Sequence, residues 1–92
     1  MNKELIYILE EIKKELTDKS DMLWTSYETA EDLRIEIDCF IVRIQENDKK
    51  VLQDMYVHFL PTSTFQEHAL QNNWSEKYMY LAQKFDAIYE AN

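Results

Sequence analysis

The twelve residues Leu33-Arg34-Ile35-Glu36-Ile37-Asp38-Cys39-Phe40-Ile41-Val42-Arg43-Ile44 fit two different folds. The first seven alternate apolar and polar side chains, which is typical of a half-buried strand. At about 100° per residue, however, one face of a helix gathers Leu33, Ile37, Phe40, Ile41 and Ile44. The apolar pattern of residues 29–46 is also long for a strand, whose usual length is about 5–6 residues. We therefore predict a helix over 29–46.

A smaller apolar stripe runs along the opposite side of this predicted helix, formed by Ile35, Cys39 and Val42. A helix that is apolar on two sides suits the centre of a bundle. We therefore predict that Cys39 is buried, structural and unreactive, since it lies in an apolar stretch with no base nearby. The alternative is an α+β fold with a hairpin at 33–60.

Four further segments carry helical spacing. Residues 2–17 place apolar side chains three and four apart, at Leu5, Ile8, Leu9, Ile12 and Leu16. Residues 49–60 and the segment from Ser75 onward follow the same spacing. Between them, Ser63 and Gln66 form a capping-box pattern that predicts a short helix. Residues 22–27 lack clear periodicity, and we expect an ordered loop or a short helical turn there.

The chain contains no glycine, so asparagine is expected to supply the left-handed conformation at helix ends. Asn47 is placed to end the helix over 29–46, and Asn72 and Asn73 to end the short helix. The prediction is a single all-α domain over 1–92, a small antiparallel bundle of four helices plus a short fifth helical turn. Connections of two to six residues make successive helices antiparallel neighbours.

Catalytic signatures are absent from the sequence. Without glycine there is no P-loop, dinucleotide fingerprint or nucleophile elbow. His58 and His68, with Asp54 and Glu67 beside them, do not match the spacing of zinc sites, and Asp54 with His58 is more simply a surface pair. We therefore expect no enzyme activity, no catalytic or metal-binding residue and no cofactor.

The net charge of −8 opposes binding to nucleic acid and to anionic lipid. The single cysteine excludes an internal disulfide, and no apolar run approaches the roughly 20 residues of a membrane span. Residues 1–6 also lack the apolar core of a signal peptide. We expect a soluble, cytoplasmic protein that binds neither nucleic acid nor membranes.

Acidic residues are concentrated in one part of the chain. Residues 20–48 carry a net charge of −6, whereas the other 63 residues together carry −2. Beside these acids lie Trp24 and Tyr27, which belong to the residue types that anchor protein interfaces. The predicted partner-binding residues are Asp21, Trp24, Tyr27, Glu28, Glu31, Asp32 and Glu36. A second aromatic group includes Trp74, expected to pack over the preceding turn, and Tyr78, expected in the core.

These features predict a non-enzymatic, acidic helical protein that binds another protein with a basic surface. The most concrete version is an immunity or antitoxin-type inhibitor of a basic toxin domain. Complementary charge would speed the capture of such a domain and block its nucleic-acid site. The alternative is a general adaptor or regulatory helical domain.

Overall fold

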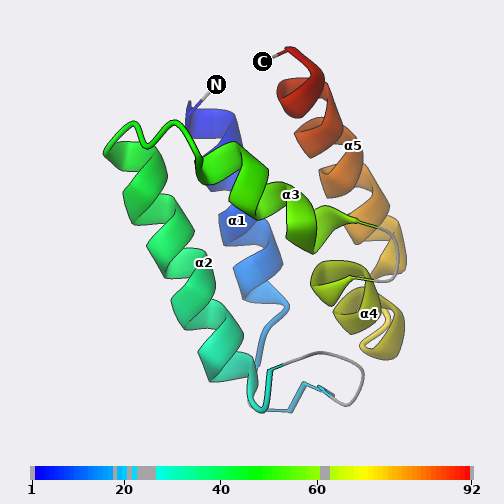
Figure 1. Ribbon diagram of the computed structural model, residues 1–92. Coiled ribbons are helices and arrows are strands. Elements are labelled where there is room, and N and C mark those ends of the chain that lie inside the picture. The colour runs from blue at the N-terminus through cyan, green and yellow to red at the C-terminus, as the bar shows by residue number, and fades with distance from the viewer. Residues whose placement is uncertain (1, 18, 21, 23–26, 61–62, 92) are drawn as a thin grey trace.

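The computed structural model describes residues 2–17, 19–20, 22, 27–60 and 63–91. Within them the chain forms no strand and five helices (Figure 1): α1 (Asn2–Lys14), α2 (Ala30–Gln45), α3 (Val51–Phe59), α4 (Thr64–Gln71) and α5 (Ser75–Ala91). The all-α prediction is confirmed, with α4 as the short fifth helix, and the hairpin alternative at 33–60 is wrong. The helix prevails because it buries Phe40 and Ile41 on one face, whereas a strand would place them on opposite faces.

Helix α1 lies between α2 and α5 and runs opposite to both (Figure 1). Helix α3 crosses from the end of α2 towards α5, and α4 packs against α3 and α5. This arrangement leaves α2 at the edge of the bundle, where it packs mainly against α1 and α3. In the described part of the chain, no helix is long and apolar enough to cross a membrane.

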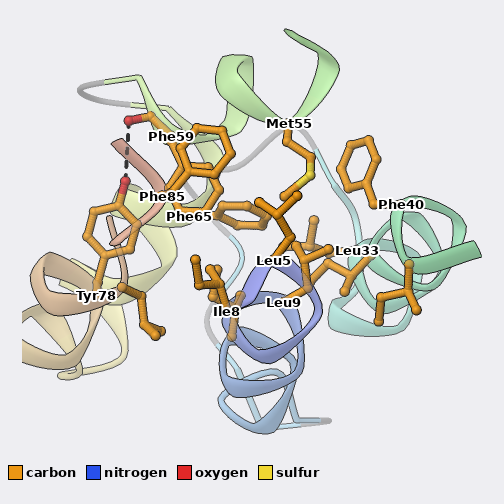
Figure 2. Close-up of a cluster of buried hydrophobic side chains, with 14 of the residues drawn as sticks. Leu5, Ile8, Leu9, Leu33, Phe40, Met55, Phe59, Phe65, Tyr78 and Phe85 are labelled. Atoms are coloured by element: carbon orange, nitrogen blue, oxygen red, sulfur yellow. Dashed lines mark hydrogen bonds between the residues drawn. The ribbon is translucent and has the colours of Figure 1, made fainter. Parts of the chain in front are cut away.

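The predicted apolar stripes form the core. The five predicted side chains of residues 2–17 are all buried, as are the five that define the inner face of α2. Phe59, Phe65 and Phe85 join α3, α4 and α5 (Figure 2). The Phe59 and Phe85 rings stack with centroids 4.2 Å apart, and Phe59 meets Phe65 edge-on at 5.0 Å. Such pairs contribute about 0.5–1.5 kcal/mol beyond the burial of their area.

Two asparagines end helices in the left-handed conformation. The φ angles are 60° at Asn47 and 64° at Asn73. Each is followed by a backbone hydrogen bond that closes a Schellman motif, from Asp48 N–H to the Arg43 carbonyl and from Trp74 N–H to the Ala69 carbonyl. Asparagine therefore takes the role of the missing glycine at the ends of α2 and α4, as the sequence predicts.

Two local predictions are wrong. Ser63 does not cap α4 through its side chain, because its hydroxyl donates instead to the Val57 carbonyl near the end of α3, at 2.6 Å. The connection between α1 and α2 spans residues 15–29 and exceeds the predicted two to six residues. Most of the loop or helical turn predicted at 22–27 lies outside the described residues. The three later connections do have the predicted length.

Candidate functional site

The predicted acidic residues gather at the start of α2. Thr29 caps this helix, because its hydroxyl accepts a hydrogen bond from the Asp32 N–H at 3.1 Å. The cap leaves the side chains of Glu28, Glu31 and Asp32 exposed to solvent. Glu31 and Asp32 occupy the first turn, where a negative charge is favourable next to the positive end of the helix dipole. These two acids therefore stabilise α2 as well as charging its surface.

The predicted aromatic anchors are only partly placed. Trp24, like Asp21, lies outside the described residues. Tyr27 is half-buried and packs against the core, with its ring 6.3 Å from that of His58. Burial raises the pKa of Tyr27, and the nearby carboxylate of Glu36 adds to the effect. Tyr27 and the half-buried Glu36 therefore lie at the inner border of the acidic surface.

The outer face of α2 corrects the prediction for Cys39. Cys39 is exposed, as are Ile35 at 52% and Val42 at 50%. The prediction of a second buried face fails because α2 lies at the edge of the bundle, with no helix of the described residues packed over this side. The sequence shows this stripe, but burial under a second layer is the wrong interpretation of it. Its three residues are the functional candidates that the site prediction omitted.

Acidic side chains surround this stripe, and we use the name outer face of α2 for the whole surface. Its residues are Glu31, Asp32, Ile35, Asp38, Cys39, Val42 and Glu46. Lys13 neutralises Asp38 through an ion pair of 2.6 Å. No ion pair within the described ranges involves Glu31, Asp32 or Glu46, nor the neighbouring Glu28. The result is an exposed apolar line bordered by acids, of which Glu31, Asp32 and Glu46 are uncompensated and Asp38 is paired.

Trp74 and Tyr78 of the second aromatic group are buried, as predicted. Trp74 is buried over the end of α4, and its ring N–H donates to Nδ1 of His68 at 2.9 Å. Tyr78 is buried in the core, and its hydroxyl donates to the Phe59 carbonyl at 3.5 Å (Figure 2). Burial raises the pKa of Tyr78 to about 12. These contacts attach α4 to α5 and α3.

The predicted surface pair of Asp54 with His58 is wrong. Asp54 pairs with Arg43 at 2.6 Å, and Arg43 also holds Asp48 at 2.8 Å. His58 is half-buried among the rings of Tyr27, Phe40 and Phe65. Its Nδ1 is buried and has no hydrogen-bond partner among the residues that the structure describes. The same residues contain no group of three metal ligands.

The environment of His58 predicts a pH-dependent stability. Burial lowers its pKa from 6.5, while Glu36 acts in the opposite direction. Below pH 6.5 the unfolded chain therefore takes up a proton that the folded protein takes up only at lower pH. Proton uptake by the unfolded chain favours unfolding. The stability that the protein has while His58 is neutral is therefore fully present above pH 6.5, and it is lost as the pH falls from there through the lower pKa of His58 in the folded protein.

The measurement is urea unfolding of the wild type and of His58→Phe between about pH 5 and pH 8. We expect the wild type to lose stability relative to the variant as the pH falls. Hydrogen bonds from Lys14 and Arg43 lower the pKa values of Glu11 and Asp48 below 4.5 and 3.8, so these groups titrate outside the window. If the difference in free energy of unfolding between the wild type and His58→Phe stayed constant from about pH 5 to about pH 8, the prediction would be wrong.

A pocket of about 620 Å³ lies at the opposite end of α2, between the start of α1, the turn before α3 and the end of α5. Leu5, Val51 and Tyr89 contribute apolar lining, and Lys49 and Lys50 contribute positive charge. None of the predicted site residues lines it. The pocket is therefore separate from the outer face of α2.

Comparisons with protein-family models, with curated proteins and with solved structures gave no significant match.

Proposed function

We propose that this protein acts by binding another protein, and that the outer face of α2 makes the contact. The observation that carries the proposal is the exposed line of Ile35, Cys39 and Val42 with unpaired acids around it. Protein interfaces combine an apolar centre that becomes buried with a polar rim that stays wet. An exposed apolar stripe bordered by charges has the same organisation.

The charge of the surface defines the partner's chemistry. Glu28, Glu31, Asp32 and Glu46 form no ion pair with any described residue, so their charges remain available to a partner. A basic surface would be attracted over a distance of about one Debye length, roughly 8 Å at physiological ionic strength. Such steering raises association rates more than it raises affinity. The partner we propose is a protein with a basic surface.

The most concrete version of this function is an immunity or antitoxin-type inhibitor of a basic toxin domain. The concentration of acidic residues in and around α2 supports it, because a toxin that acts on nucleic acid presents a basic site of complementary charge. A general adaptor or regulatory domain is the second candidate, and the exposed apolar stripe favours it. An inhibitor should be encoded beside its toxin and should abolish the toxin's activity on binding, whereas an adaptor should leave its partner active.

The first experiment is a pull-down from the native host with identification of partners by mass spectrometry. Binding kinetics are then measured for the triple variant Glu28→Lys, Glu31→Lys, Asp32→Lys. We expect association to slow by about tenfold or more and to lose most of its salt dependence. The lysines in the first turn of α2 should also cost about 0.3–1 kcal/mol each.

The matched control is Glu4→Lys, Glu10→Lys, Glu76→Lys. These three acids are exposed, form no ion pair with described residues and include two first-turn positions, at Glu4 in α1 and Glu76 in α5. The control therefore changes net charge and helix dipoles by the same amount at a different place. Equal slowing by both triple variants would mean that net charge alone acts, and the proposed surface would be wrong.

A further inference from the structure

The exposed residues of α2 follow the spacing of a coiled-coil seam. Ile35, Cys39 and Val42 are separated by four and three residues, which is the alternation of the two apolar positions in a heptad. The same alternation continues to Asp32 on one side and to Glu46 on the other. The seam therefore has an apolar centre and acidic ends, over a length of about 21 Å at the helical rise per residue.

The positions beside this seam are predominantly acidic. One edge of the seam contains, at intervals of seven residues, Glu31, Asp38 and Gln45. The other edge contains Glu36 and Arg43. Residues at these flanking positions choose the partner of a coiled coil through interhelical ion pairs. Arg43 already holds Asp48 and Asp54, so its charge is compensated within the protein. Lys13 likewise compensates Asp38, so a helix laid on this face would meet the uncompensated carboxylate of Glu31 on one edge and that of Glu36 on the other.

We propose that the outer face of α2 binds an amphipathic helix of the partner, with an apolar stripe flanked by lysine or arginine. The inference rests on the proposed function and adds the form of the partner. A basic helix would bury Ile35, Cys39 and Val42 and would pair its charges with Glu31, Asp32 and Glu46. Docking of an amphipathic helix along apolar anchors at this spacing is a recurring mode of recognition.

A second copy of the chain does not fit this face. In a parallel pair the seam would oppose Asp32 to Asp32 and Glu46 to Glu46. In an antiparallel pair the two kinds of seam position face each other, so either Asp32 would face Val42 or Glu46 would face Ile35, and an acid would be buried against an apolar side chain. Like charges that face each other within an interface disfavour the complex. The charge pattern thus selects a basic helix over self-association.

The test uses three synthetic helical peptides of 21 residues as probes. The first has leucines at the seam spacing with lysines beside them, the second replaces those lysines with glutamates, and the third replaces the leucines with alanines. Affinity is measured by fluorescence anisotropy, and the site is mapped by amide chemical shifts and by protection of the Cys39 thiol from alkylation. We expect the first peptide alone to bind, to shift α2 resonances and to protect Cys39.

The double variant Ile35→Ala, Val42→Ala should weaken binding of the first peptide by about tenfold or more. The matched control is Leu70→Ala, Met79→Ala, which removes two exposed apolar side chains from α4 and α5, at 56% and 60% exposure. This control should leave the affinity unchanged. Both double variants should stay folded, because substitutions at exposed positions usually change stability little.

Four results would overturn the inference. The alanine peptide could bind as tightly as the first, which would mean that charge alone acts. The strongest shifts could fall on α3 or α5, or the protein could dimerise through α2 in sedimentation experiments. A host partner whose binding responds to the acidic triple variant but not to Ile35→Ala, Val42→Ala would also reject helix docking, while the proposed function would stand.

Discussion

Phe85→Ala is expected to lower the free energy of unfolding by about 3–5 kcal/mol. Phe85 is fully buried, stacks on Phe59 at 4.2 Å between centroids and lies 5.9 Å from the ring of Tyr89. Truncation removes these contacts and leaves a cavity that the surrounding helices can fill only in part. A domain of this size has a total stability of about 5–15 kcal/mol, so the loss is a large fraction of it.

The measurement is urea unfolding followed by circular dichroism, with the change read from the midpoint at constant slope. Met79→Ala is the matched control, because Met79 lies on the same helix and is 60% exposed. We expect this control to stay within about 0.5 kcal/mol of the wild type. Equal effects of the two substitutions would contradict the packing of α5 against α3.

Ile37→Asp is expected to cost about 3–5 kcal/mol or to abolish folding, because it would place an unpaired charge in the core. Ile37 is fully buried on the inner face of α2. Ile35→Asp, only two residues away, should change stability by about 0.5 kcal/mol, because Ile35 is 52% exposed on the outer face. The contrast between neighbouring isoleucines is the strongest test of the helical register.

A strand would give a different result. Residues 35 and 37 would share one face of a strand, and the two substitutions would have similar effects. Thermal and urea unfolding of both variants distinguishes the cases directly. Ile35→Asp has a second use, since it places a negative charge at the apolar centre of the outer face of α2 without disturbing the core. It should therefore weaken binding of the lysine-flanked peptide while the protein remains folded.

Local sequence was sufficient to predict the buried stripes of α1 and α5 and the ends of α2 and α4. Side chains three and four residues apart lie on one face of any helix, so the buried stripes of α1 and α5 could be identified without knowledge of their neighbours. Asn47 and Asn73 end α2 and α4 because their short side chains tolerate positive φ, a property of the residue itself. These predictions depend on interactions within about five residues along the chain.

The hydrogen-bond partner of Ser63 and the ion-pair partner of Asp54 could not be predicted from local sequence. Ser63 has a suitable position for a capping box, but the end of α3 presents the Val57 carbonyl to its hydroxyl. Asp54 lies one turn before His58 on the same helix, yet it forms its ion pair with Arg43 from the end of α2. Each outcome depends on which group the fold brings close from elsewhere in the chain, and periodicity contains no such information.

The same distinction applies to the candidate site. Composition and order of residues predict an all-helical chain, and they show a concentration of acids at 20–48 and two apolar stripes on the helix predicted over 29–46. They do not establish whether that helix is central or lies at an edge. Packing of α1 between α2 and α5 places α2 at the edge, so Ile35, Cys39 and Val42 face solvent instead of a second layer. The physical reason is that helix formation is governed by neighbours along the chain, whereas exposure of a helix face is governed by contacts between segments distant in sequence.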